Sequence, residues 1–208
     1  MTQHPRLMSP LKLRDHTLRN RIVFGAHTAN MSDQGMPGPR FGKYLLERAL
    51  GGAAMVVAEP VPVHRTGVLT RGNFLHSDDR VIPAFRTITD EVKAAGAVIL
   101  QQLYHIGAHG DSDLSFAPHW SPSGGPSYHD SDGSHAMTGA EVEAKASGFQ
   151  GVEVWAAYHS LLDQFWTPWS NQRTDAWGGS LKGRTRFSRE LIERVRRACG
   201  EDFVVGLA

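Results

Sequence analysis

The sequence predicts an α/β fold, an incomplete (β/α)8 TIM barrel with about its first five β/α units. Short, continuous apolar runs alternate with amphipathic segments, a pattern typical of parallel strands covered by helices. Glycines follow the first two amphipathic segments, as is common at helix ends. Only five apolar runs occur in 208 residues, whereas such barrels typically need about 250. We therefore expect one domain, residues 1–208, that forms the N-terminal portion of a barrel and lacks strands six to eight.

The first half of the chain contains two predicted strands with a helix between them. Residues 21–26 (RIVFGA) form a buried strand, followed by a polar loop with several glycines and prolines. A helix is expected from Phe41 to Leu50, and Gly51-Gly52 ends it. Residues 53–58 (AAMVVA) form the second strand.

A second helix and a third strand follow. The helix is expected over residues 79–95, because Phe85, Ile88 and Val92 recur at helical spacing, and Gly96 ends it. Residues 97–103 (AVILQQL) form the third strand. The segment 105–136 is rich in Gly, Ser, Pro and His, and we predict that it is too polar to contribute to the core.

The connection near residues 138–149 is unusually short. Residues 138–141 (TGAE) resemble the start of a capped helix. A crossover between parallel strands needs about a dozen residues or more. The sequence leaves open whether this connection is one short helix or has lost part of its length.

The C-terminal third contains two further strands and one helix. The fourth strand lies within residues 151–156, and a long loop, 162–180, follows it. Ser180 is a suitable N-cap for a helix over residues 181–198. The fifth strand is expected over residues 203–207. A loop rich in Trp, Asn, Arg and Asp after a barrel strand is a common place for a functional site.

Composition excludes several classes of function. There are 22 basic and 21 acidic residues, for a formal net charge of +1. This balance predicts neither a nucleic-acid nor a membrane surface. The one cysteine, Cys199, cannot form a disulfide within the chain, which fits a reducing compartment. We expect a cytoplasmic protein that acts on a small-molecule substrate, with homo-oligomerisation left open.

The 11 histidines raise the alternative of a metal site. Several lie within a Gly/Ser-rich segment that lacks helical periodicity and a matching carboxylate motif. We therefore predict no metal site there. The histidines concerned are His105, His109, His119, His129 and His135.

Three separated segments resemble one family of flavoenzymes. Residues 7–12 (LMSPLK) with 17–23 (TLRNRIV) resemble the opening of the old yellow enzyme family. Residues 171–180 (NQRTDAWGGS) with 184–187 (RTRF) resemble its most recognisable segment. Gln102-Leu103, His105 and Gly107 match its third strand. The resemblance implies an FMN-dependent TIM barrel that passes hydride between NAD(P)H, the flavin and a small organic substrate.

The resemblance also implies which residues contact FMN. Gly25, Ala26, His27 and Thr28 align with the segment that lies against the flavin ring; Thr28 alternatively satisfies a turn. Pro60 aligns with a position that often offers its backbone N–H, a donor that proline lacks. Gln102 aligns with the glutamine that binds the pyrimidine edge, since an amide offers both donor and acceptor. Alternatively, Gln102 is a buried amide satisfied within the protein.

The positions implied for catalysis depart from the family pattern. Trp155, Tyr158 and Ser160 occupy the places where ene-reductases have two carbonyl-polarising residues and a proton-donating tyrosine. Trp155 and Tyr158 are therefore the expected substrate-binding residues, and Tyr158 is the candidate catalytic donor. His159 would lie on the wrong face if the strand continued. Aromatic replacement resembles the amine-dehydrogenase branch, whose rings attract an ammonium group.

Two interpretations remain open from the sequence. In the first, the chain belongs to an FMN oxidoreductase that acts on an enone-type or amine-type substrate. In the second, it is a truncated, non-catalytic partial barrel that does not hold FMN on its own. The resemblance also implies a phosphate anchor on late strands and an arginine near Ala208. Neither lies within the 208 residues.

Overall fold

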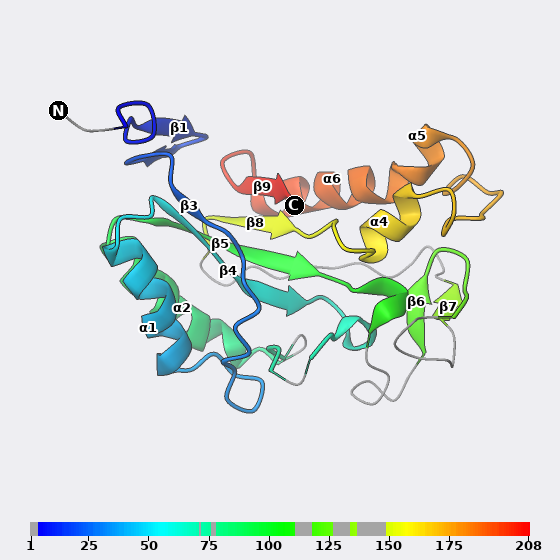
Figure 1. Cartoon of the computed structure of the whole chain (residues 1–208), viewed down its shortest axis with the longest axis horizontal. Coiled ribbons are helices and arrows are strands. Elements are labelled where there is room, and N and C mark those ends of the chain that lie inside the picture. The colour runs from blue at the N-terminus through cyan, green and yellow to red at the C-terminus, as the bar shows by residue number, and fades with distance from the viewer. Residues whose placement is uncertain (1–3, 71, 76–77, 111–117, 127–133, 137–148) are drawn as a thin grey trace.

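Five parallel strands form the central sheet of the computed structural model (Figure 1). The structure describes residues 4–70, 72–75, 78–110, 118–126, 134–136 and 149–208. The order β3-β4-β5-β8-β9 follows the chain. Each new strand thus joins the same edge, which is the topology of a barrel and not of a sheet with a switch point. The strands are β3 (Val23–Phe24), β4 (Met55–Pro62), β5 (Val98–Tyr104), β8 (Gly151–Val154) and β9 (Val204–Leu207).

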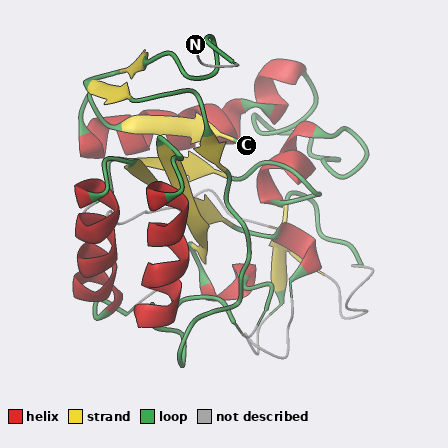
Figure 2. Ribbon diagram, turned by 60° about the vertical axis from the view of Figure 1, so that its left-hand side comes forward, coloured by secondary structure: helices red, strands yellow, loops and turns green. Residues whose placement is uncertain are grey.

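Helices cover the outer face of this sheet. The helices α1 (Pro39–Leu50) and α2 (Val81–Ala94) lie side by side against one half of it, as Figure 2 shows. The helix α6 (Arg186–Cys199) packs against the other half. The apolar residues of α1 and α2 meet those of β4 and β5 in one buried cluster. Its members include Phe41, Leu45, Phe85, Ile88, Val92, Val56, Ala58 and Ile99.

A hairpin packs against the amino-terminal part of the inner face. It consists of β1 (Leu11–Leu13) and β2 (His16–Leu18), an antiparallel pair. Leu18 is buried with inner-face residues of β4, β5 and β9, namely Val57, Val98, Leu100 and Val204. The carboxyl half of the inner face carries polar side chains instead. The packing therefore separates a structural end of the sheet from an end available for binding.

The remaining short elements lie at the carboxyl end of the strands. Two 3-10 turns, η1 (Arg65–Gly67) and η2 (Gly107–His109), follow β4 and β5. The strands β6 (His119–Ser121) and β7 (Ser134–Ala136) pair in parallel. The helices α4 (Leu161–Trp166) and α5 (Leu181–Arg184) follow β8.

The structure corrects three details of the sequence interpretation. The segment 162–180 is not loop throughout, because α4 occupies its beginning. The helix expected over 181–198 is interrupted at Thr185 and forms α5 and α6. The polar segment does enter the interior, since His119 and Trp120 are both buried. The short connection expected near 138–149 lies outside the described residues except for Phe149.

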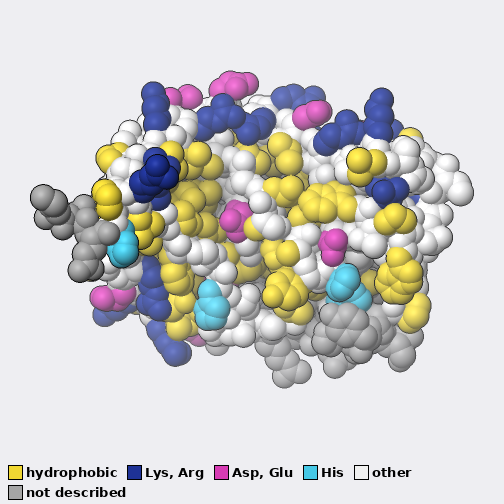
Figure 3. All heavy atoms as spheres, turned by 45° about the horizontal axis from the view of Figure 1, so that its top comes forward, with side chains coloured by type: hydrophobic (Ala, Val, Ile, Leu, Met, Phe, Trp, Pro, Cys, Tyr) yellow, Lys and Arg dark blue, Asp and Glu magenta, His cyan; other side chains and the backbone are white. Residues whose placement is uncertain are grey.

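Figure 3 shows apolar side chains gathered across one face of the molecule, with acidic side chains among them. Large apolar residues of both edge strands are exposed: Val23 by 46% and Leu207 by 48%.

Among the helices of the described part, none combines the length and the apolar character needed to cross a bilayer.

Gly151 allows β8 and β9 to approach closely. A Cβ atom on Gly151 would lie 2.4 Å from the carbonyl oxygen of Val204, its partner across the ladder. Because that contact is with backbone, only separation of the strands could relieve it. We expect Gly151→Ala to lower the free energy of unfolding by about 2 kcal/mol, measured by urea unfolding. Gly25→Ala is the control, since a Cβ there meets nothing within 4 Å. Equal losses in both variants would contradict the expectation.

Candidate active site

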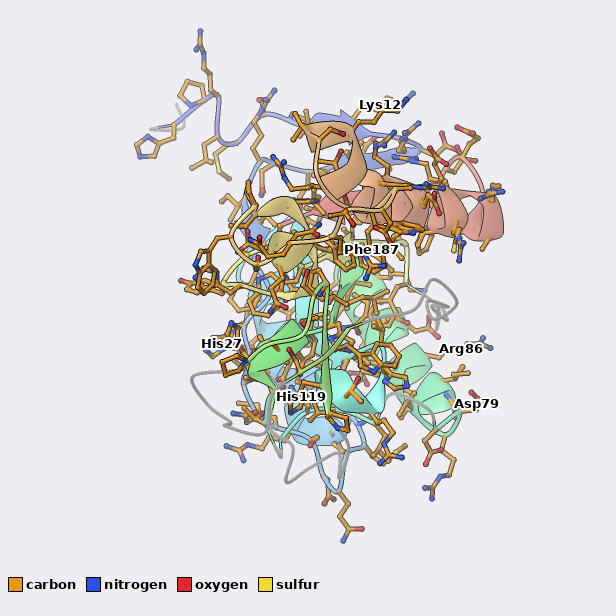
Figure 4. The ribbon with its side chains drawn as sticks, turned by 90° about the vertical axis from the view of Figure 1, so that its right-hand side faces the viewer. Lys12, His27, Asp79, Arg86, His119 and Phe187 are labelled. Atoms are coloured by element: carbon orange, nitrogen blue, oxygen red, sulfur yellow. The ribbon has the colours of Figure 1, made fainter. Side chains whose placement is uncertain are left out.

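The candidate site lies at the carboxyl end of the sheet, where the segments after β3, β4, β5 and β8 meet. Figure 4 looks onto this end and labels His27 and His119, while Lys12 on the hairpin lies at the upper rim of the view. In an open or closed sheet of parallel strands, this end gathers the loops that carry function.

The predicted cofactor segment after β3 offers mainly backbone to the interior. Gly25 is exposed, and Ala26 packs against the inner-face cluster. The His27 side chain is directed toward α1, where its Nδ1 atom lies 3.0 Å from the hydroxyl oxygen of Tyr44. Thr28 is half-buried. A contact of His27 with a ligand in the interior would therefore come from its backbone.

Glu59 ties this segment to β4. Its carboxylate accepts hydrogen bonds from the backbone N–H of Ala29 at 2.9 Å and of Asn30 at 3.3 Å. The side chain is 1% exposed. Burial raises the pKa of Glu59, although the two backbone donors counteract this rise. Glu59 thus fixes the position of the residues next to Thr28.

Pro60 lies in an irregular part of β4. The pairing of β4 with β5 shifts register between Ala58 and Val61, as expected where a proline interrupts a ladder. The amide of Gln101 donates to the freed carbonyl oxygen of Glu59 at 2.5 Å. Pro60 itself is buried. The irregularity is therefore held in place by a side chain of the neighbouring strand.

Gln102 faces the inner side of the sheet. Its Nε2 atom donates to the Glu153 carboxylate of β8 at 2.5 Å. This bond fixes the orientation of the amide, because the carboxylate can only accept. The Gln102 Oε1 atom then remains as the acceptor on that side chain. The arrangement can receive an N–H donor from a planar ring.

Three aromatic side chains form a series that runs from the buried Tyr104 to the exposed Tyr158. The rings of Tyr104 and Trp155 meet edge to face, with centroids 5.8 Å apart. Tyr158 lies beyond, 6.2 Å from Trp155, and is 82% exposed. The Tyr104 hydroxyl donates to Asn73 at 2.6 Å and accepts from the Leu69 backbone at 3.0 Å. Burial raises the pKa of Tyr104, which keeps its phenol neutral.

Tyr158 and His159 lie in a strained turn. Both have positive φ angles, 55° and 56°, in a region where L-residues other than glycine are uncommon. Strand β8 ends at Val154, so the alternation of a strand does not govern His159. Its ring lies near that of His109, with centroids 6.1 Å apart, and its Nδ1 is 3.5 Å from Asp163. Strain of this kind often accompanies function.

Ser160 does not extend the rim. It is fully buried, and its hydroxyl donates to the Trp155 carbonyl oxygen at 3.3 Å. A buried hydroxyl that donates to the backbone is not available to a substrate at the exposed strand ends. Ser160, which aligns with one of the family's catalytic positions, is therefore not among the groups exposed at the strand ends.

The segment 171–180 makes hydrogen bonds that connect it to neighbouring loops. The Asn171 amide donates to the carbonyl oxygens of Phe165 at 2.8 Å and Trp177 at 2.9 Å. Arg173 forms an ion pair with Asp175 and donates to the Pro122 carbonyl oxygen at 2.8 Å. The guanidinium holds the pKa of Asp175 below its usual range. These contacts connect loops, and their residues support the scaffold.

Two residues of the site were not predicted from the sequence. Glu59 binds the backbone of Ala29 and Asn30, and Tyr104 packs against Trp155. Both lie on apolar strands, where a single polar group is the available signal. Among the described residues, no group of three potential metal ligands is close enough to hold an ion. His129 and the side chain of His135 lie outside the described part.

Comparison with known proteins gives one family. Residues 6–207 match the model of the NADH:flavin oxidoreductase / NADH oxidase family. Among curated proteins, a probable N-methylproline demethylase of Rhizobium meliloti is 34% identical over 97% of this chain and 32% of its own length. A multifunctional alkene reductase/demethylase of Caballeronia cordobensis is 30% identical over 96% and 32%.

Solved structures agree with this comparison. A 2-naphthoyl-CoA reductase complex has a TM-score of 0.91 with 28% identity, covering 99% of this chain and 35% of its own. The chain therefore spans about a third of the length of these relatives.

Proposed function

Because this chain belongs to the NADH:flavin oxidoreductase / NADH oxidase family, we propose that its site serves FMN-dependent hydride transfer involving a small organic substrate. NAD(P)H is the proposed co-substrate. The chain contributes a five-stranded portion of the barrel, proposed to be its first five β/α units. This activity is proposed for a whole protein of the family, because the chain spans about a third of the length of its relatives.

The residues on the inner face fit the planar ring of FMN. The free acceptor of Gln102, with its amide already held by Glu153, suits an N–H on the pyrimidine edge. The segment from Gly25 to Thr28 offers backbone and one hydroxyl at the end of β3. Pro60 supplies no donor. FMN, when bound, supplies the group that accepts or delivers hydride; the protein residues orient it.

The proposal for the substrate rests on the aromatic side chains around Trp155. Trp155 and Tyr158 lie at the end of β8, where ene-reductases of the family have polar residues, and the buried Tyr104 packs edge to face against Trp155. Aromatic faces attract an ammonium group with roughly 0.5 to 2 kcal/mol per contact. We therefore favour an amine substrate over an enone. Tyr158 remains the proposed proton-transferring side chain, because it is exposed and its ring lies next to that of Trp155.

Two of the relatives are named for related chemistry. The Rhizobium meliloti protein is named a probable N-methylproline demethylase. The Caballeronia cordobensis protein is named for both alkene reduction and demethylation. The first name supports an N-alkylated amine for this chain, and the second keeps an enone as the alternative outcome of the test.

Replacing Trp155 tests the substrate class. We expect Trp155→Leu to weaken binding of N-methylpyrrolidine, a tertiary amine, about tenfold, because the ring face that attracts the cation is removed. Trp155→Phe, which keeps a face, should bind within about threefold of the original. Calorimetric titration of the FMN-loaded protein measures both, with cyclohexenone as a neutral ligand of similar size. Tighter binding of cyclohexenone than of the amine would contradict the amine assignment.

Flavin binding is a separate question with its own measurement. The purified polypeptide is mixed with FMN and passed through a desalting column, and visible flavin absorbance retained at one equivalent per chain would support an FMN site within this portion of the barrel. Gln102→Leu should release FMN more readily, because it loses the polar contact to the ring. A colourless wild-type product would support the alternative of a partial barrel that does not hold FMN alone.

A further inference from the structure

Gln164, on the short helix α4, binds backbone of the two segments that follow β5 and β8. These strands are neighbours in the sheet, and α4 lies beyond the end of β8 (Figure 1). The helix contacts η2 and comes directly after the turn of Tyr158 and His159. The Gln164 side chain is 4% exposed. Its amide is therefore a buried link between a turn of the site and the neighbouring segment.

Three hydrogen bonds fix the amide in one orientation. The Oε1 atom accepts from the backbone N–H of Ala108 at 3.2 Å. The Nε2 atom donates to the carbonyl oxygen of His159 at 2.5 Å and to that of Ile106 at 3.4 Å. A backbone N–H only donates and a carbonyl oxygen only accepts, so exchange of the amide's oxygen and nitrogen would break all three bonds. The bonds thus join η2 to the turn after β8.

Gly107 leaves room for this amide. A Cβ atom at Gly107 would lie 2.3 to 2.6 Å from the nitrogen, carbon and oxygen atoms of the Gln164 amide. The φ angle of Gly107, 72°, also lies in the left-handed region that glycine adopts without strain. The contact therefore requires both the missing side chain on η2 and the long side chain on α4.

Side chains of α4 bind both backbone polar groups of His159. Its carbonyl oxygen accepts from Gln164, and its N–H donates to Oδ2 of Asp163 at 3.0 Å. Asp163 is 29% exposed, so water competes for its bond, whereas the Gln164 amide is buried. Tyr158 and His159 have φ angles of 55° and 56°, and each such residue is disfavoured roughly tenfold. A hydrogen bond offsets this roughly two- to tenfold, so the turn needs several.

We propose that Gln164 is a positioning residue, which holds the turn of Tyr158 and His159 in its left-handed conformation and thereby sets the place of the Tyr158 side chain beside Trp155. The two rings have centroids 6.2 Å apart. Gln164 is buried and bound to backbone, so it acts through Tyr158 and not on a substrate. Its consequence for catalysis rests on the proposed role of Tyr158 in proton transfer.

Substitution by leucine tests the positioning in the full chain, without FMN. NMR spectra of the wild type near neutral pH should show strong intraresidue HN–Hα cross-peaks for Tyr158 and His159, because a positive φ brings these hydrogens close. In Gln164→Leu these peaks should weaken, and exchange of the Ala108 amide should accelerate at least tenfold. A leucine variant that keeps both the positive φ angles and a protected Ala108 amide would overturn the proposal.

Gln164→Glu is a sharper test, because its carboxyl group can be switched. A protonated carboxyl offers a donor and an acceptor, as the amide does, whereas a carboxylate only accepts and would face the carbonyl oxygens of His159 and Ile106. Burial disfavours the charged form, so the group should ionise above the usual pKa of about 4.3. The positive φ angles should be present below this transition and lost above it. A turn unchanged across the titration would contradict the role of the Gln164 bonds.

Two controls isolate the effect. Gln172→Glu alters an exposed amide that also donates to two backbone carbonyls, and it should leave the turn unchanged at every pH. Loss of the turn in this variant as well would overturn the assignment to Gln164. The wild type, titrated in parallel, accounts for the titratable side chains nearby. These are Asp163 on α4, His159 in the turn, and His105 and His109 at η2.

Kinetics separates this inference from the proposed function. With the FMN-loaded protein and N-methylpyrrolidine, Gln164→Leu should lower kcat about tenfold and change KM less than about threefold, because Trp155 keeps its ring face while Tyr158 leaves its place. An unchanged kcat would overturn the positioning role. Absence of amine turnover in the wild type would instead contradict the proposed function, and the NMR measurements would still decide whether Gln164 holds the turn.

Discussion

Replacing Asn171 with alanine is expected to lower the free energy of unfolding by about 3 to 4 kcal/mol. Asn171 is 4% exposed and makes three hydrogen bonds to backbone. Its amide donates to Phe165 and Trp177, and its Oδ1 accepts from the Arg173 N–H at 3.2 Å. Alanine would leave these buried backbone groups without partners, and each such group costs roughly 1 to 3 kcal/mol.

The adjacent residue provides a matched control. The Gln172 amide also donates to two backbone carbonyls, of Pro168 at 2.7 Å and Trp169 at 2.9 Å, but it is exposed. Water can replace those bonds, so Gln172→Ala should cost under about 1 kcal/mol. Urea unfolding of both variants separates the effect of burial from the number of bonds. Similar losses in the two variants would show that the Asn171 bonds do not carry the stability of the loop.

Replacing Glu59 with leucine is expected to cost about 3 kcal/mol. The substitution leaves the backbone N–H groups of Ala29 and Asn30 without an acceptor in a buried place. Glu59→Gln keeps one acceptor oxygen and should lose only about 1 kcal/mol. Exchange protection of the Ala29 amide should disappear in the leucine variant. Retained protection there would mean that the segment after β3 is held by other contacts.

The same residue gives a pH dependence of defined sign. The pKa of Glu59 is raised above 4.5 in the folded state, so the folded protein retains a proton that the unfolded chain releases. The contribution of Glu59 to stability therefore falls as pH rises from about 4.5 through the raised folded value. The free energy of unfolding of the wild type minus that of Glu59→Gln should decrease across this range. His105, whose folded pKa is lowered by burial, has the opposite slope.

Local patterns predicted the strands and helices because the signals are local. The apolar run 97–103 corresponds to β5, and the helical spacing of Phe85, Ile88 and Val92 corresponds to α2. The order of the sheet follows from the same alternation of elements. The boundary of β4 was less accessible: it extends to Pro62, because Gln101 on the neighbouring strand compensates for Pro60.

The site could be predicted only in part. The positions of Trp155, Tyr158 and Gln102 follow from strand ends, and the structure brings Trp155 and Tyr158 together. The roles of the predicted cofactor and catalytic residues remain proposals. The contact of Tyr104 with Trp155 and the burial of His119 depend on pairs distant in sequence. A local pattern contains no such information, and the many polar residues around His119 concealed its burial.

The turn at Tyr158 and His159 limits how this protein can be stabilised by design. Each residue has a backbone conformation that glycine would adopt with less strain, so a library selected for thermal resistance would favour glycine at both positions. That outcome would remove the two side chains that the turn presents at the rim. Selection for thermal stability and selection for function would therefore favour different residues at these two adjacent positions.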